Sequence, residues 1–267
     1  MEERLQWIKL VPQSWCHWEP VQGGTAVHQA LSRRYPGAAC FVVEPGAQRS
    51  VAAALALRKP WWHPARWNAP AVRFEMPGDG AVDMLWSNMA LHMAADPQAL
   101  LQRWHRALAA DGFLMFSCLG PDTLRGVREA WRGAGWPPPT HAFTDMHDWG
   151  DMLVNTGFAE PVMDMERITL TFSGPPRAIQ ELRGLGRNLH VARFGGLRGR
   201  QWLSSMGQWL TQADPLASGQ VALEFEVIYG HAFKARPRLT VKSETSLSLE
   251  EMRHVLQQGR AASGGRV

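Results

Sequence analysis

Residues 82–122 read VDMLWSNMALHMAADPQALLQRWHRALAADGFLMFSCLGPD, in the order strand, loop, helix, strand. Val82–Trp86 is a short, mostly apolar run, as in a buried strand. Asp96 and Pro97 mark a helix start, with Asp as N-cap and Pro in the first turn. Gly112–Leu119 is a second apolar run. Because parallel strands need a crossover of this length, the stretch predicts a βαβ unit in a parallel sheet.

The ends of these two strands form the first candidate site. Ligands of open parallel sheets bind beyond the carboxyl ends of the strands. Those ends are Ser87–Asn88 after the first strand and Leu119–Asp122 after the second. We therefore expect Ser87 and Asn88 to contact a bound cofactor.

The rest of the chain continues the alternation of strands and helices. The other expected strands are one within Pro12–Gly24, Ala39–Val43, a short one at Ala71–Phe74, Val162–Phe172 with a bend near Glu166, and Val221–Tyr229. The other expected helices are Thr25–Tyr35, one ending at Leu57, Asp122–Trp131, one from Thr144 or Asp145 to Asn155, and Pro175–Leu216. This order predicts a doubly wound, Rossmann-like α/β domain of residues 1–174 and 218–240. Residues 175–217 would form an inserted helical lid, and residues 241–267 a short terminal helix and a frayed tail.

Composition excludes several classes of protein. The chain has 267 residues, of which 45% are hydrophobic and 19% charged, as in globular proteins. No apolar run reaches the roughly 18 residues of a membrane helix, and the start MEERLQW lacks a signal-peptide core, so we expect a cytoplasmic protein. Cys16, Cys40 and Cys118 are scattered and show neither metal-ligand nor disulfide spacing. We expect no metal site.

Positive charge gathers in one segment. Leu182–Ala213 contains no Asp or Glu, and its five arginines are Arg183, Arg187, Arg193, Arg198 and Arg200. Such a surface steers acidic partners toward the protein. Nucleic acid is a rival partner, but few aromatic residues alternate with these arginines, which disfavours a base-stacking surface.

Several stretches together carry a family resemblance. WSNMALHMAADPQALLQRWHRALAADGFLMFSCLGPDTLRGVREAW, beginning at Trp86, resembles the second half of class I S-adenosyl-L-methionine (SAM) methyltransferases. FTDMHDWGDMLVNTGF, PVMDMERITLTF and FEVIYGHAF narrow the resemblance to the malonyl-acyl-carrier-protein O-methyltransferases of biotin synthesis (BioC type). The resemblance covers about residues 80–234 and is weak before them. Met1 and Glu2 precede the family-like ERLQWIKL, so the helical segment that the family carries ahead of it is expected to be missing or to lie upstream of this start.

The resemblance implies SAM as cofactor and assigns residues to its site. The family pattern is an acid followed by Gly-x-Gly-x-Gly, which places Glu19 at the acid and Val21, Gly23 and Thr25 at the glycines. Gly23 alone matches, and Gly24 enters if the alignment shifts by one residue. Glu44, at the end of the second strand, corresponds to the acid that binds both ribose hydroxyls, for which two carboxylate oxygens are suited.

Methylation of a malonyl carboxylate requires positioning and exclusion of water rather than a catalytic base. Candidate groups for the carboxylate are Arg125 and Arg128, spaced three residues apart on a predicted helix, because Arg binds carboxylates in a bidentate fork. Tyr229 and His231 are candidates for the substrate mouth.

Three hypotheses follow from these residues. The first is SAM-dependent O-methylation of malonyl-acyl carrier protein in biotin synthesis, with the acidic carrier protein bound by the five arginines. The second is a methyltransferase-like protein without activity that binds a partner through its basic segment, which the altered glycine turn would favour. The third is a methyltransferase with another acceptor, such as a small carboxylate or a protein arginine.

Overall fold

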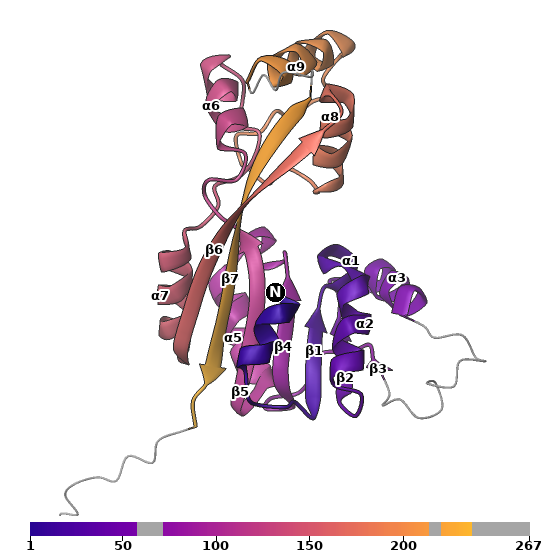
Figure 1. Cartoon of the computed structure of the whole chain (residues 1–267), viewed down its shortest axis with the longest axis vertical. Helices are drawn as coiled ribbons and strands as arrows, with labels where there is room; N and C mark the ends of the chain where they lie inside the picture. Colours follow the sequence, from indigo (N-terminus) through magenta and orange to yellow (C-terminus); the bar gives the residue numbers. More distant parts are fainter. Residues whose placement is uncertain (58–71, 214–219, 237–267) are drawn as a thin grey trace, which may run out of the picture. The chain divides into compact units, whose positions relative to one another are not determined.

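Seven strands form one mixed sheet in the order β3-β2-β1-β4-β5-β7-β6 (Figure 1). The computed structural model describes residues 1–57, 72–213 and 220–236. Its strands are β1 (Ser14–Trp18), β2 (Ala39–Val43), β3 (Val72–Arg73), β4 (Val82–Asn88), β5 (Leu108–Leu119), β6 (Phe158–Phe172) and β7 (Val221–Lys234). β1 to β5 pair in parallel, whereas β7 is antiparallel to both β5 and β6.

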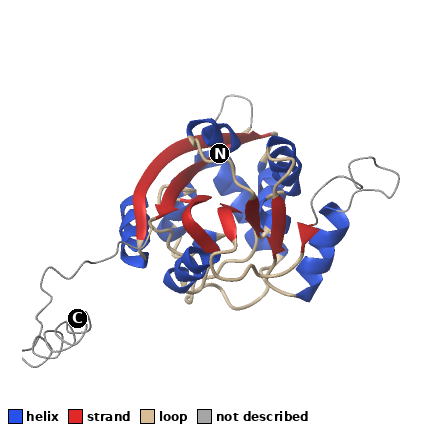
Figure 2. Ribbon diagram, turned by 90° about the horizontal axis from the view of Figure 1, so that it is seen from below, coloured by secondary structure: helices blue, strands red, loops and turns tan. Residues whose placement is uncertain are grey.

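Helices lie on both sides of this sheet (Figure 2). They are the 3-10 helices η1 (Glu2–Trp7) and η2 (Leu91–Met93), and the α-helices α1 (Pro20–Gly23), α2 (Thr25–Arg34), α3 (Ala47–Leu57), α5 (Pro97–Ala107), α6 (Arg125–Gly133), α7 (Met146–Thr156), α8 (Pro175–Gly184) and α9 (Arg200–Ala213). The predicted βαβ unit is β4–α5–β5, and the Asp96 carboxylate caps α5 by accepting the Ala99 N–H at 2.9 Å.

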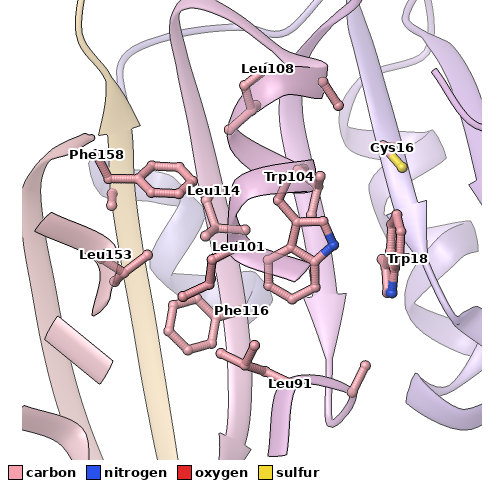
Figure 3. Close-up of a cluster of buried hydrophobic side chains, with 14 of the residues drawn as sticks. Cys16, Trp18, Leu91, Leu101, Trp104, Leu108, Leu114, Phe116, Leu153 and Phe158 are labelled. Atoms are coloured by element: carbon pink, nitrogen blue, oxygen red, sulfur yellow. The ribbon is translucent and has the colours of Figure 1, made fainter. Parts of the chain in front are cut away.

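Successive side chains of the central strands pack in two separate hydrophobic cores, one on each face of the sheet. On β5, Leu114 and Phe116 pack with Leu101 and Trp104 of α5 and with α7 (Figure 3). Phe113 and Met115 point the other way and pack in a cluster that includes η1, α2 and α3. Because side chains alternate across a strand, a sheet buried on both faces must be apolar at successive positions, as β5 is. The predicted doubly wound class is therefore confirmed.

A third core lies where β6 and β7 extend beyond the other strands. α6, α8 and α9 surround these strand ends, and the core is built from Leu124, Val127, Trp131, Ala178, Ile179, Met206, Leu210, Val221, Leu223 and Phe225. The predicted helix over Pro175–Leu216 is only partly correct: residues 185–199, between α8 and α9, are not helical, and residues 214–216 lie outside the described part. Five glycines fall in 184–199, which explains the interruption.

Three further boundaries differ from the sequence prediction. The irregularity in β6 falls between Ala159 and Val162 rather than near Glu166, because Pro161 cannot donate to the ladder and occupies the bulge. α6 begins at Arg125 because the four residues before it form a turn. β5 begins at Leu108, and residues 109–112 bulge out of its pairing with β4.

Residues Met1–Ala235 form one compact unit. The predicted terminal helix and tail, residues 241–267, lie outside the described residues. No helix in the described ranges is both long enough and apolar enough to span a membrane.

Candidate functional site

The predicted cofactor residues come together at the carboxyl edge of the sheet. Trp18 on β1 pairs with Val43 on β2 and with Ser87 on β4. The residues that follow these three, Glu19, Glu44 and Asn88, therefore lie side by side. This edge is where open parallel sheets bind ligands.

A single helical turn, α1, occupies the position of the glycine-rich turn. Gly23 within it is packed against β4: a Cβ at this position would lie 2.6 Å from the Asn88 carbonyl oxygen. The Asn88 side-chain amide also donates to the Gly23 carbonyl. Gly24 has a φ of 99°, in the region that favours glycine. Both glycines are thus required by the backbone, although the rest of the family pattern is altered.

Glu44 has one engaged and one unengaged carboxylate oxygen. Oε1 accepts the Val21 N–H at 2.7 Å, and Oε2 is buried without a partner among the described residues. Burial raises the pKa of Glu44, opposed by the hydrogen bond from Val21. A buried acceptor at the end of β2 fits a ribose hydroxyl, so the residues present suit SAM.

Arg49 joins this site from α3, and no sequence motif identifies it. Its guanidinium lies 3.2 Å from both the Glu19 carboxylate and the Gln22 side-chain oxygen. Glu19 also accepts from the Trp18 indole at 3.2 Å. Burial raises the pKa of Glu19 and the Arg49 charge opposes this, so Arg49 supports the ionised carboxylate.

Ser87 and Asn88 have different surroundings. The Ser87 hydroxyl is buried and has no hydrogen-bond partner within the described part of the chain. The Asn88 Oδ1 accepts from the Ser117 hydroxyl at 2.5 Å, so this side chain links β5 to the α1 turn. Asn88 therefore holds the edge of the site together.

Beside this edge is a pocket of about 510 Å³, and most of its walls are apolar or aromatic. Its lining comes from η2, α6, the proline run 137–139, and the segment between α8 and α9. Four of the predicted arginines line it, namely Arg128, Arg187, Arg193 and Arg198, whereas Arg125, Arg183 and Arg200 do not. Sequence reasoning missed its aromatic walls, Trp131, Phe143, Phe194 and Trp202.

The two arginines of α6 do not act as a pair, contrary to the prediction from their spacing. The Arg125 side chain is 62% exposed and forms ion pairs with Asp122 at 3.5 Å and Glu129 at 3.0 Å. Arg128 lines the pocket, donates to the Pro121 carbonyl through Nη2, and keeps a buried Nε without a partner among the described residues. Burial lowers the pKa of Arg128, so a carboxylate would be a favourable neighbour.

Arg198 is partly buried and packs against aromatic rings. Its guanidinium carbon lies 4.4 Å from the ring centres of Phe194 and Trp202, and 6.0 Å from that of Trp136. Trp131, Trp136 and Trp202 also contact one another, with ring centres 5.0–5.8 Å apart. This cluster fixes the segment between α8 and α9 against α6.

Tyr229 and His231 do not line the 510 Å³ pocket. They line a second hollow, of about 580 Å³, together with Arg4 and Trp7 of η1. Arg4 lies over the Tyr229 ring at 4.4 Å. The structure therefore does not bring these two residues together with Arg128, which lines the other pocket.

A histidine that the sequence analysis did not select lines the main pocket. His92 follows β4 in η2, and its Nδ1 accepts the Leu119 N–H at 3.3 Å. His141 Nε2 contacts the His92 carbonyl at 2.8 Å, and Phe143 packs edge-on against both rings. Burial, with a smaller contribution from His141, lowers the pKa of His92 to about 4. Its position directly after a strand end was the available signal.

Glu226 on β7, which the sequence analysis did not select, is a buried acid. Its Oε2 accepts the Asp122 N–H at 2.6 Å, and its backbone exchanges hydrogen bonds with the Thr123 hydroxyl. A Cβ on Gly120 would lie 2.6 Å from Oε2. The carboxylate thus fixes the turn after β5, from which α6 and Arg128 follow. Among the described residues, no group of three His, Cys, Asp or Glu side chains is arranged to hold a metal ion.

Known proteins resemble this chain in sequence and in fold. A methyltransferase domain family model matches residues 23–116. The malonyl-[acyl-carrier protein] O-methyltransferase of Gallionella capsiferriformans is 35% identical over 256 residues, covering 90% of this chain and 83% of that protein. The protein of the same name from Laribacter hongkongensis is 43% identical over 165 residues, covering 60% of this chain and 54% of that protein.

Two solved structures show the same class I methyltransferase fold. The first structure is that of a protein from Bacillus halodurans C-125 with a provisional methyltransferase assignment. It matches with a TM-score of 0.57 and 16% sequence identity, and the match covers 88% of this chain and 99% of that chain. The YcgJ protein of Bacillus subtilis matches with a TM-score of 0.57 and 12% sequence identity, and the match covers 88% of this chain and 97% of that chain. At these identities the likeness concerns the fold alone.

Proposed function

This chain belongs to the malonyl-[acyl-carrier protein] O-methyltransferase family, and from this premise we propose that it methylates the malonyl carboxylate of malonyl-acyl carrier protein in biotin synthesis. The observation that carries the proposal is the 510 Å³ pocket next to the carboxyl edge of the sheet. It joins apolar walls to several arginines, of which Arg128 has a buried Nε without a partner among the described residues, and an apolar site with a few cationic groups suits a small acid on an apolar arm.

SAM is the cofactor, and when bound it would supply a methyl group activated on a sulfonium. The acceptor carboxylate would be methylated in its ionised form, so the protein would not need to remove a proton. Glu44 would accept from the ribose through its free Oε2. Ser87, with its buried and unpartnered hydroxyl, would face the same ligand. The backbone of Gly23 and Gly24 lets the α1 turn approach it closely.

On the acceptor side, Arg128 would bind the malonyl carboxylate through its free Nε edge. Trp131, Trp202 and Phe194 would exclude water around it. Residues 175–217 would act as the lid, since part of this segment forms one wall of the pocket. Because the carboxylate is already ionised, orientation and desolvation are sufficient and no base is needed.

The carrier protein would dock on the outside of the same segment. Arg183, Arg187 and Arg193 are exposed there, and so are the side chains of Val191 and Leu197, at 95% and 101%. Basic and apolar side chains side by side suit an acidic protein that presents a small apolar contact. Arg198 is engaged with aromatic rings, so it supports this surface rather than forming it.

The test of activity uses SAM labelled in its methyl group, with malonyl-acyl carrier protein as acceptor and acetyl-acyl carrier protein as the control without a carboxylate. We expect label to pass to the malonyl form alone. Arg128→Gln should raise the KM for the acceptor about tenfold or more, because a charged hydrogen bond is lost. Transfer to the acetyl form, or no transfer by a chain that binds SAM, would contradict the proposal.

The docking surface is tested by reversing Arg183, Arg187 and Arg193 to Glu. Carrier-protein association should weaken strongly at low salt, because six units of charge change at the surface. A matched control reverses Arg33, Arg103 and Arg106, which are exposed on α2 and α5. Equal loss in both triple variants would indicate a general charge effect and contradict docking on the lid.

A further inference from the structure

His92 is held in one orientation by contacts on three sides. The Leu119 N–H bonds to Nδ1 at 3.3 Å, and the His141 ring stacks nearly parallel to it, with ring centres 6.5 Å apart. The Phe143 ring meets it edge-on at 5.8 Å. A partly buried side chain fixed in this way presents its remaining edge in a defined direction.

The same contacts decide which ring nitrogen carries the proton. A backbone N–H can bond only to an unprotonated nitrogen, so Nδ1 is an acceptor and the neutral ring has its proton on Nε2. Nε2 has no hydrogen-bond partner among the described residues, although the residue lines the main pocket. His92 therefore carries a donor that nothing in the described structure uses.

The position of this donor links the cofactor edge to the acceptor pocket. His92 is four residues beyond Asn88, which contacts Gly23, and its own partner Leu119 is the last residue of β5. Arg128 lines the same pocket from α6. A group that enters the pocket toward the sheet edge would meet both side chains.

We propose that His92 Nε2–H donates a hydrogen bond to the carboxylate of the acceptor and orients it for methyl transfer. This inference rests on the proposed function. Negative charge on the carboxylate is lost as the ester forms, so a second cation would stabilise the starting state more than the transition state. A neutral donor orients the oxygen atoms at a smaller loss of nucleophilicity. Arg128 then supplies attraction and His92 supplies direction.

Two substitutions separate this role from simple packing. His92→Phe keeps a planar ring but has no donor, whereas His92→Gln keeps an acceptor for Leu119 and a donor for the pocket. We expect His92→Phe to lower kcat/KM for malonyl-acyl carrier protein about 10- to 100-fold, with SAM affinity and thermal stability near those of the unmodified chain. His92→Gln should retain activity within about fivefold of the parent.

Each outcome bears on a different claim. If the parent methylates and His92→Phe is equally active, or if His92→Gln loses as much activity as His92→Phe, the role of His92 is overturned while the function stands. If the parent does not methylate malonyl-acyl carrier protein, the proposed function fails. In that case malonyl-pantetheine is added to the chain saturated with S-adenosylhomocysteine: a shift of the His92 Nε2 resonance supports carboxylate binding, and an unshifted resonance refutes it.

Discussion

Several side chains at the site each have one hydrogen-bonding atom engaged by the protein and another left without a partner. Glu44 uses Oε1 on Val21, Arg128 uses Nη2 on Pro121, and His92 uses Nδ1 on Leu119. The engaged atom fixes the rotamer, and the other atom is then directed without further loss of side-chain entropy on binding. Most buried polar groups in proteins are hydrogen-bonded, so an unpartnered polar atom at this site is a candidate for contact with a ligand.

Glu44→Gln tests whether the unpartnered carboxylate oxygen of Glu44 binds SAM. The amide keeps the shape of the side chain but removes its charge and one of its two acceptors. We expect SAM affinity, measured by calorimetry, to fall about 10- to 100-fold with little change in thermal stability. Asp151→Asn, a change of an exposed acid on α7, is the matched control and should bind normally. Unchanged affinity in Glu44→Gln would remove the ribose assignment.

Buried histidines make stability depend on pH. The ring of His17 is buried beside His28, and burial, reinforced by His28, lowers the pKa of His17 to about 3. In the unfolded chain His17 has the ordinary histidine pKa of 6.5, so below pH 6.5 it is protonated there while it stays neutral in the folded chain. His17 thus contributes stability above pH 6.5, and this contribution is lost as the pH falls from 6.5 toward 3.

From pH 7.5 to 5.5 the parent should therefore lose about 1.4 kcal/mol more unfolding free energy than His17→Gln, measured by urea titration at both pH values. Leu31→Val, a buried change without a titrating group, should shift stability equally at both pH values. Parallel pH curves for the parent and His17→Gln would refute the assignment.

At the scale of elements, the α1 turn depends on close packing against β4. In Gly23→Ala the new methyl group would meet the Asn88 carbonyl oxygen at 2.6 Å, and backbone cannot yield as a flexible side chain can. We expect a loss of about 1–3 kcal/mol in unfolding free energy, together with weaker SAM binding. Gly37→Ala, where a methyl group would meet nothing within 4 Å, should change neither. Normal SAM binding by Gly23→Ala would show that the turn does not contact the cofactor.

The segment between α8 and α9 depends in a similar way on Arg198. Removing its guanidinium from between Phe194 and Trp202 should loosen the segment, and we expect trypsin to cleave after Arg193 several times faster in Arg198→Ala. Arg200→Ala, an exposed change at the start of α9, is the control. Equal cleavage rates in the two variants would mean that the aromatic cluster holds without Arg198.

Helix-capping residues and the alternation of apolar side chains predicted the helices and strands well where one such local pattern was strong. Asp96 and Asp145 both cap helices as their positions indicated, and the alternation of β7 identified a strand. The pocket was less predictable, because the direction of a side chain depends on packing between distant elements. Arg125 and Arg128 lie three residues apart on one helix, yet only Arg128 lines the pocket. The burial of Glu226 depends on a turn about a hundred residues away.

In the whole molecule, the three cores differ in how they are enclosed. Two are enclosed between the sheet and its helices, whereas the third surrounds only β6 and β7. We expect amides of α8, α9 and residues 185–199 to exchange hydrogen earlier than those of β4 and β5. Bound malonyl-acyl carrier protein should slow exchange in this region specifically. Uniform protection across the chain would contradict a separately mobile lid.

β6 and β7, of 15 and 14 residues, each contribute to two cores. Their ends near Phe158 and Lys234 belong to the main sheet, and their ends near Phe172 and Val221 pack in the third core. A recombination point placed across both strands, near the Glu166–Val227 pair, would therefore exchange α8, α9 and the segment between them as one piece. Such a chimera would replace one wall of the pocket and keep Arg128, His92 and the residues at the carboxyl edge of the sheet.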